Sequence, residues 1–212
     1  MANDFSDMPQ RRALAAIARD FHRRGWMAGT AGNLSARAAD RRDSFWITAS
    51  GLPKGMLDED DFIMIDIGDG RVLKTLDNNA KPSAETSIHQ TLYRLFPDCG
   101  ACLHVHTVDA CLAAANTPGQ SSSLRLPALE MVKGLGIWEE NPQVDLPLFD
   151  NIPDVPAIAR AIAQRFLAQP PDIPALMIRD HGVTVWGASL QDAYNRVEVM
   201  EFMMSYLARK TG

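Results

Sequence analysis

Three histidines have the spacing that most directly indicates chemistry. His104 and His106 lie two positions apart in the segment 101–107, which its apolar run predicts to be a buried strand. Side chains two apart on a strand point to one face, so both imidazoles can bind the same metal ion. His181 stands at a predicted tight turn between two later strands, where its side chain can project into a cleft. Three imidazoles with an open fourth position are typical of catalytic zinc, so Zn²⁺ is the metal that we expect.

The histidine pattern alone leaves alternatives open. Imidazole ligands also suit copper, nickel or iron, and two histidines in this spacing are often a half-buried pair with ordinary hydrogen bonds. Cys102 would share the face of His104 and His106, so a Cys-His-His site is a rival arrangement. Cys99 and Cys102 form a C-x-x-C pair, but the pair leads into a strand and not into a helix N-terminus. We therefore expect buried thiols and not a redox motif.

Two carboxylates are candidates for proton transfer. A base that removes a proton next to a carbonyl leaves an enolate, which needs a cation beside it. Glu85 lies in the first turn of a predicted helix, a position that the helix dipole also favours for an ordinary carboxylate. His89 follows one turn later, and either residue can face solvent. Glu130 lies in the long irregular stretch 117–154; such stretches are often functional, although an ordinary surface carboxylate is the commoner case.

Three short segments can bind an oxyanion through backbone amides and small polar side chains. They are GTAGN at 29–33, TASG at 48–51 and KPSAE at 81–85. Glycine lets the backbone approach an anion closely, and serine or asparagine adds a donor. Each segment on its own is more typical of an ordinary turn. None matches the nucleotide-binding P-loop or the dinucleotide fingerprint.

Helices and strands must position these residues, and they alternate without a strict order. The first predicted helix starts at about Asp7, has Pro9 in its first turn and ends at Gly25. Two further helices are predicted to have caps: one over 84–96 capped by Ser83, and one over 156–168 capped by Asp154. The remaining helices are predicted over 109–116 and 189–210. Strands are predicted at 45–48, 62–67, 71–75 and 101–107, and as a hairpin of 175–180 with 183–187. This pattern favours one domain, 1–212, with a mixed sheet covered by helices.

The composition limits the class of protein. The chain has 212 residues, 46% of them hydrophobic, and a formal net charge of −5, which argues against a general nucleic-acid binder. No apolar run approaches the roughly 20 residues that span a bilayer. The first residues lack the basic-then-apolar order of a secretory signal, so we expect a cytoplasmic protein. Val199, Phe202 and Met203 form an apolar face on the last helix that belongs either to an oligomer interface or to the core.

The segments GTAGNLSAR, TASGLPKG, KPSAETSIHQTLY, LHVHT and RDHGVTVWG, in this order, resemble the motifs of the class II aldolase/adducin family. The resemblance covers nearly the whole chain. It implies an α/β fold of three αβα layers with a central, mainly antiparallel mixed sheet. It also implies a homotetramer with active sites at subunit interfaces, and one Zn²⁺ per subunit held by His104, His106 and His181.

The resemblance also implies roles for other residues. Phosphate-binding residues would be Asn33, Ser50, Gly51 and Ser83. The sugar-phosphate aldolases have a second serine after the one that matches Ser83, whereas this chain has Ala84. Glu85 matches the catalytic glutamate of those aldolases. The expected partner is a small sugar phosphate, with neither nucleic acid nor membrane.

The segment PALEMVKG resembles one branch of the family, the methylthioribulose-1-phosphate dehydratases of methionine salvage. In that branch the glutamate of this segment, here Glu130, is the catalytic acid/base. The implied activity is a zinc-dependent hydro-lyase that converts 5-methylthioribulose 1-phosphate to 2,3-dioxo-5-methylthiopentyl 1-phosphate. The alternative is an aldolase or epimerase with Glu85 as base, acting on fuculose 1-phosphate or ribulose 5-phosphate. An adducin-like domain without catalysis would lack the metal ligands, but all three histidines are present.

Overall fold

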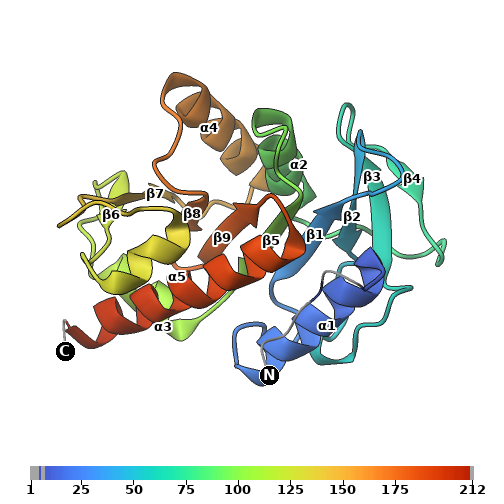
Figure 1. Cartoon of the computed structure of the whole chain (residues 1–212). Helices are drawn as coiled ribbons and strands as arrows, with labels where there is room; N and C mark the ends of the chain where they lie inside the picture. Colours follow the sequence, from blue (N-terminus) through green and yellow to red (C-terminus); the bar gives the residue numbers. More distant parts are fainter. Residues whose placement is uncertain (1–4, 6–7, 211–212) are drawn as a thin grey trace.

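A single mixed sheet runs through the computed structural model, which describes residue 5 and residues 8–210 (Figure 1). The strands within these residues are β1 Asn33–Arg37, β2 Ser44–Thr48, β3 Phe62–Asp66, β4 Val72–Lys74, β5 Ala101–Val105, β6 Ser123–Arg125, β7 Asp145–Phe149, β8 Ala175–Ile178 and β9 Gly182–Gly187. Their order across the nine-stranded sheet is β4-β3-β2-β1-β5-β9-β8-β7-β6. Every neighbouring pair is antiparallel except β7 with β8, which is parallel. The expected mainly antiparallel mixed sheet is confirmed.

Helices cover both faces of this sheet. The described helices are α1 Gln10–Arg23, α2 Thr86–Leu95, α3 Val108–Ala115, α4 Val155–Ala168 and α5 Leu190–Lys210, with short 3₁₀ helices η1 Lys54–Met56 and η2 Glu130–Leu135. The buried hydrophobic residues of α1, α3 and α5 belong to one hydrophobic cluster, and those of α2 and α4 belong to a second. The two clusters lie on opposite faces of the sheet, so the predicted three-layer αβα arrangement is confirmed (Figure 1).

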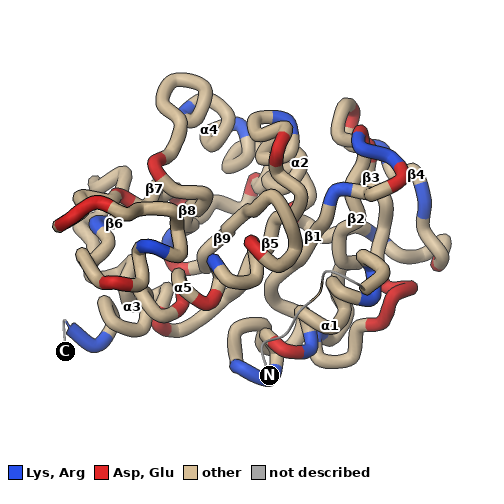
Figure 2. Tube along the Cα trace, in the orientation of Figure 1, with Lys and Arg blue, Asp and Glu red and all other residues tan. Residues whose placement is uncertain are grey.

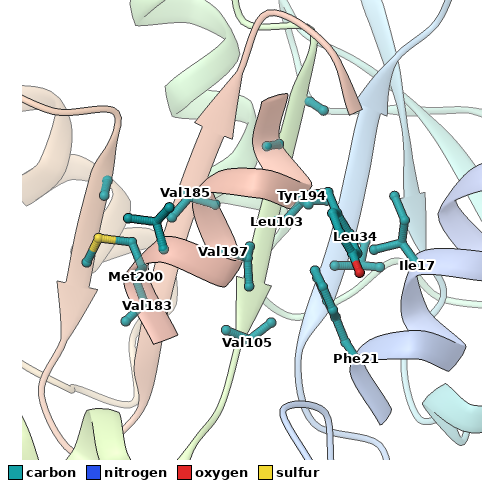
Figure 3. Close-up of a cluster of buried hydrophobic side chains, with 14 of the residues drawn as sticks. Ile17, Phe21, Leu34, Leu103, Val105, Val183, Val185, Tyr194, Val197 and Met200 are labelled. Atoms are coloured by element: carbon teal, nitrogen blue, oxygen red, sulfur yellow. The ribbon is translucent and has the colours of Figure 1, made fainter. Parts of the chain in front are cut away.

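The larger cluster fixes α1 and α5 against the central strands (Figure 3). Ala101, Leu103 and Val105 of β5 point into it, whereas Cys102, which lies between Ala101 and Leu103, packs into the second cluster. This alternation is the period of two that the sequence of β5 predicts. Each fully buried aliphatic side chain of this kind contributes about 1.5–3 kcal/mol. The packing therefore holds β5, the strand that carries His104, rigidly from both faces.

Helix α1 begins slightly later than its sequence predicts. Pro9 flanks the first helical residue, Gln10, and does not lie within the first turn. Asp7, the expected start, lies outside the described residues. The end of the helix is confirmed, because Gly25 follows it with φ 78°, a conformation that glycine adopts without a steric penalty.

The expected cap of α2 at Ser83 is wrong by two residues. The Ser83 carbonyl accepts from the backbone N–H of Thr86 at 3.1 Å and from its hydroxyl at 2.6 Å. The Ser83 hydroxyl accepts from Glu85 N at 3.3 Å. These bonds close a turn over 83–86, and the helix starts only at Thr86. Because Glu85 then occupies the cap position, its side chain turns toward the sheet. The predicted cap of α4 is confirmed, since Asp154 Oδ1 accepts from Ala157 N at 3.2 Å.

The apolar residues of α5 divide between core and surface. Val199 and Met203 are buried in the larger cluster, whereas Phe202 is 49% exposed. Charged residues of both signs intermingle in the loops around β3 and β4 (Figure 2), where Arg41 pairs with Asp43 at 2.9 Å. Among the described residues, no helix has the length and apolar character needed to cross a bilayer.

A buried carboxyl lies between α3 and α5. Glu201 of α5 is 3% exposed, and its Oε1 has no hydrogen-bond partner among the described residues. Burial raises the pKa of Glu201 to about 7, nearby Asp109 adds to the rise, and a hydrogen bond from the Thr107 hydroxyl opposes it. The folded chain therefore holds a proton on Glu201 at pH values where the unfolded chain releases it.

This carboxyl should make the protein less stable as the pH rises. A carboxyl whose pKa is higher in the folded chain stabilises the fold at low pH, and this contribution is lost as the pH rises from about 4.5 through about 7. The Glu201→Gln side chain cannot ionise. The free energy of unfolding of this variant, relative to that of the unmodified protein, should therefore rise by about 2–3 kcal/mol between pH 5 and pH 8. Urea unfolding at both pH values measures this change, with Glu198→Gln, which removes a partly exposed carboxyl of the same helix, as control. An equal difference at both pH values would contradict the prediction.

Candidate metal centre

The three histidines meet where β5 and β9 lie side by side. In the antiparallel register His104 pairs with Thr184 and Val105 with Val183, so the β8–β9 turn with His181 lies beside the end of β5. Gly182 allows this approach, because a Cβ at that position would lie 2.0 Å from the Val105 carbonyl oxygen. Figure 1 shows the two strands at the centre of the sheet. The hairpin predicted around His181 and Gly182 is confirmed.

The imidazoles converge on one point together with a carboxylate. His104 Nε2 lies 2.8 Å from His106 Nε2, and the ring of His181 lies within 4.4 Å of the His106 ring and 5.1 Å of the His104 ring, centroid to centroid. Glu85 Oε1 lies 2.7 Å from His181 Nε2, and its Oε2 lies 3.3 Å from His104 Nε2. One donor atom from each of the four residues lies within 4.8 Å of the others.

Hydrogen bonds and burial keep His104 in the protonation state and tautomer that can bind a metal ion. Its Nδ1 lies 3.0 Å from the Val183 carbonyl oxygen and 3.0 Å from Thr184 Oγ1. A carbonyl can only accept, so Nδ1 carries the proton and the lone pair of Nε2 points into the cluster. Burial lowers the pKa of His104 and lowers that of His106 to about 3. Both imidazoles are therefore neutral near pH 7, which is the form that binds metal.

Glu85 is the ionised member of the cluster. Burial alone would raise its pKa, but His104 and the hydrogen bonds from His181 and Asn33 hold that pKa well below its usual range. A carboxylate beside three imidazoles completes a donor set that suits a divalent transition metal. The donor chemistry of these four residues therefore fits the metal ion that the family resemblance implies.

The rival Cys-His-His arrangement does not form. Among the described residues, the group of convergent ligand atoms contains Glu85 and the three histidines but not Cys102. Cys99 and Cys102 are free thiols packed into the second hydrophobic cluster. Burial raises the pKa of Cys99 to about 12 and that of Cys102 well above its usual value. Both are neutral thiols in the core, as the sequence predicts.

The structure brings together the three segments that the sequence predicts to bind an anion. The backbone of TASG meets that of KPSAE, with Ser50 N donating to the Lys81 carbonyl at 2.8 Å and Ser83 N donating to the Thr48 carbonyl at 3.2 Å. Gly51 follows Ser50 with φ 76°. Asn33 is buried and donates its side-chain amide to Glu85 Oε2. The phosphate roles of Asn33, Ser50, Gly51 and Ser83 stay predictions.

Lys54 is a residue of this region that sequence reasoning missed. It is 2% exposed, and its ammonium donates to the carbonyls of Thr30 at 2.9 Å and Leu52 at 3.1 Å. It thereby ties GTAGN to the loop that follows TASG. Its charge also contributes to the low pKa of His106. A lysine after a proline in a turn normally faces solvent, so the sequence contains no local signal for its burial.

Glu130 lies outside the four-residue cluster. It is the first residue of η2, its side chain is 82% exposed, and its carboxylate pairs with Lys133 Nζ at 2.6 Å. His89, by contrast, is fully buried beside the cluster, and Glu85 is buried too. The expectation that either of these could face solvent is therefore wrong, because α2 turns this face onto β1.

Comparison with known proteins agrees with this geometry. The sequence model of the family "Class II Aldolase and Adducin N-terminal domain" matches residues 12–207. The chain is 53% identical over 197 residues to a methylthioribulose-1-phosphate dehydratase of Microcystis aeruginosa, covering 93% of this chain and 94% of the relative. It is 45% identical over 193 residues to a protein of that name from Leptospira biflexa, covering 90% and 92%.

The fold is similar to that of solved structures. YgbL of Escherichia coli, a putative aldolase/epimerase/decarboxylase, superposes with a TM-score of 0.76 at 30% sequence identity, covering 93% of this chain and 87% of that one. The sequence match, the sheet order and the convergent histidines agree with one another. The chain belongs to the class II aldolase and adducin family.

Proposed function

We propose that this protein is a hydro-lyase that dehydrates 5-methylthioribulose 1-phosphate to 2,3-dioxo-5-methylthiopentyl 1-phosphate in methionine salvage. The observation that carries the proposal is the 53% identity, over nearly the full length of both chains, to a protein named methylthioribulose-1-phosphate dehydratase. The intact cluster of Glu85, His104, His106 and His181 supports a catalytic member of the family. An interaction domain would have no use for convergent neutral imidazoles.

The metal of the proposed enzyme is Zn²⁺, held by His104, His106 and His181. When bound, it supplies Lewis-acid stabilisation of the negative charge that develops when a proton leaves a carbon next to a carbonyl. The tautomer of His104, fixed by Val183 and Thr184, orients its ligand atom without any movement of the strand. Glu85, ionised and within hydrogen-bond distance of His181, adds a negative charge that stabilises a cation at this point.

The dehydration itself needs one group that moves a proton. In the proposed reaction Glu130 takes the proton from C3 of the substrate and delivers it to the C4 hydroxyl, which leaves as water. The C3 enol that remains becomes the 2,3-diketone by tautomerisation. A positioned acid/base of this kind is worth about 10²–10⁴-fold in rate. Glu130 thus gains a proton and gives it up again within one turnover.

The exposure of Glu130 supports a site shared between subunits. The carboxylate is 82% exposed and stands apart from the histidine cluster of its own chain. We therefore assign Glu130 to the metal centre of a neighbouring subunit in a homotetramer. Trp138, on the same segment, is also largely exposed, as expected of a surface that a second copy covers.

The phosphate of the substrate would bind at Asn33, Ser50, Gly51 and Ser83. The adjacency of the TASG and KPSAE backbones supports this placement. Lys54 supplies a buried positive charge next to the GTAGN loop, which favours a dianion nearby. The amide of Asn33 has a second N–H beside the one bonded to Glu85, so it can serve both groups.

A comparison of three substrates tests the activity. Zinc-loaded protein should release water from 5-methylthioribulose 1-phosphate, with the diketone product detected by mass spectrometry. Fuculose 1-phosphate and ribulose 5-phosphate should react slowly or not at all. The alternative reaction is aldol cleavage or epimerisation with Glu85 as base, which the position of Glu85 inside the cluster favours. Efficient cleavage of fuculose 1-phosphate without any dehydration would overturn the proposed reaction and leave the family assignment intact.

A further inference from the structure

A row of buried polar side chains leads away from Glu85 between α2 and β1. Glu85, His89 and Tyr93 are spaced four residues apart, so they lie along one face at the start of and within α2. Asn33 and Ser35 are two apart on β1 and therefore share one face of that strand. Asn33, Ser35, His89 and Tyr93 are all buried. Two regular patterns of polar residues thus face each other inside the protein.

Hydrogen bonds join these five side chains end to end. Glu85 Oε2 accepts from Asn33 Nδ2, and Asn33 Oδ1 lies 2.5 Å from His89 Nε2. His89 Nδ1 lies 2.7 Å from Ser35 Oγ, which lies 2.9 Å from the Tyr93 hydroxyl. The last member, Tyr93, packs against Phe45 with ring centroids 4.8 Å apart. The row therefore starts in the hydrophobic core and ends at the metal cluster.

The chemistry of the groups fixes the direction of every bond. The Glu85 carboxylate can only accept, so Asn33 must present its NH₂ group to it and its carbonyl oxygen to His89. His89 Nε2 then carries the proton, and Nδ1 must accept from the Ser35 hydroxyl. The Ser35 hydroxyl has one proton, and His89 Nδ1 at 2.7 Å is a nearer acceptor for it than the Cys102 carbonyl at 3.3 Å, so the Ser35 oxygen accepts from Tyr93. Burial lowers the pKa of His89 to about 3, which agrees with a neutral ring in this single tautomer.

We propose that Tyr93, Ser35, His89 and Asn33 form a positioning chain that orients Glu85 toward the metal centre. All four donate in one direction, and aligned hydrogen bonds in a water-free interior strengthen one another. His89 is the central positioning residue, because its Nε2–H holds the carbonyl end of the Asn33 amide away from the carboxylate. An inverted amide would place oxygen against oxygen and push Glu85 away from the histidines.

Metal binding in the absence of substrate tests the chain. His89→Phe should lower the affinity of metal-free protein for Co²⁺ and Zn²⁺ by about 10–100-fold, as removal of groups behind metal ligands does elsewhere. The visible spectrum of bound Co²⁺ should change as Glu85 moves. His89→Gln, whose amide can still donate to Asn33, should recover part of the affinity. Tyr93→Phe should cause a smaller loss in the same direction.

The control removes a hydroxyl of equal burial elsewhere. Tyr194 is also buried, and its hydroxyl donates to Asp20 at 2.8 Å. Tyr194→Phe should therefore cost stability without altering metal affinity. In a Glu85→Gln background, His89→Phe should have no further effect on affinity, because the chain acts only through Glu85.

Wild-type metal affinity and an unchanged Co²⁺ spectrum in a folded His89→Phe protein would overturn the proposal. If His89→Phe does not fold, the same two measurements on Tyr93→Phe and Ser35→Ala test the proposal. Unchanged metal affinity and an unchanged Co²⁺ spectrum in both variants would overturn it. The use of an oriented Glu85 rests on the proposed function, but these measurements need no substrate. A protein that fails the substrate comparison can therefore still pass this test, and the reverse also holds.

Discussion

Replacing His106 by alanine is expected to abolish metal binding and to lower turnover by about 10³-fold or more, because several kcal/mol of charge stabilisation disappear with the metal. His106 Nε2 lies 2.8 Å from His104 Nε2, so both atoms are close enough to bind one metal ion. Metal content by elemental analysis and turnover on the proposed substrate measure the two effects. The loss should persist at saturating substrate, since it affects the reacting atoms and not only binding.

A second histidine provides the matched control for this prediction. His22 is exposed near the end of α1, where its Nδ1 lies 2.9 Å from the Met27 carbonyl oxygen. His22→Ala should retain full metal content and activity. A His106→Ala protein that keeps one tightly bound zinc per chain would show that the metal lies elsewhere. Urea unfolding of both variants without metal should show similar stability, because His106 lies beyond the end of β5.

The convergence of the three histidines in the candidate metal centre can largely be predicted from local sequence patterns. The period of two on a strand places His104 and His106 on one face, and a tight turn places His181 at the end of the neighbouring strand. Both features depend on residues close together in the chain. The predicted convergence therefore needed only one long-range pairing, that of β5 with β9.

The orientation of α2 could not be predicted in the same way. Helical spacing shows that Glu85 and His89 share a face, but polar residues do not show whether that face is buried. This face is buried because Asn33 and Ser35 of β1, more than fifty residues away in the sequence, provide hydrogen-bond partners for His89. Buried polar groups become stable only when such partners exist. The local sequence pattern of α2 does not indicate whether such distant partners exist.

The burial of Lys54 and the start of α2 could not be predicted either, for different reasons. Lys54 is buried because backbone carbonyls of two loops accept hydrogen bonds from its ammonium. Every residue type has a backbone carbonyl, so the sequence does not indicate such partners. The start of α2 depends on which of two overlapping turns forms, and the turn of Ser83 with Thr86 prevails. Helix boundaries are commonly uncertain by one or two residues.

Glu130→Gln is expected to lower turnover by about 10²–10⁴-fold while zinc content stays unchanged. The amide keeps the shape of the side chain but cannot take a proton from carbon. Its partner Lys133 is exposed as part of a surface ion pair, so little stability should be lost. Glu140→Gln, an exposed glutamate of the same segment, is the matched control and should behave as the unmodified protein. Full activity of Glu130→Gln would remove Glu130 from the reaction.

Mixing two inactive variants tests whether Glu130 acts across a subunit interface. A Glu130→Gln subunit keeps its metal, and a His106→Ala subunit keeps its Glu130. In a closed ring with identical interfaces, random mixing in equal amounts places the two intact halves together at about a quarter of the sites. Activity should therefore return to about a quarter of that of the unmodified protein when the variants are unfolded and refolded together. If Glu130 instead serves the histidines of its own chain, every site lacks one essential group, and mixing restores nothing.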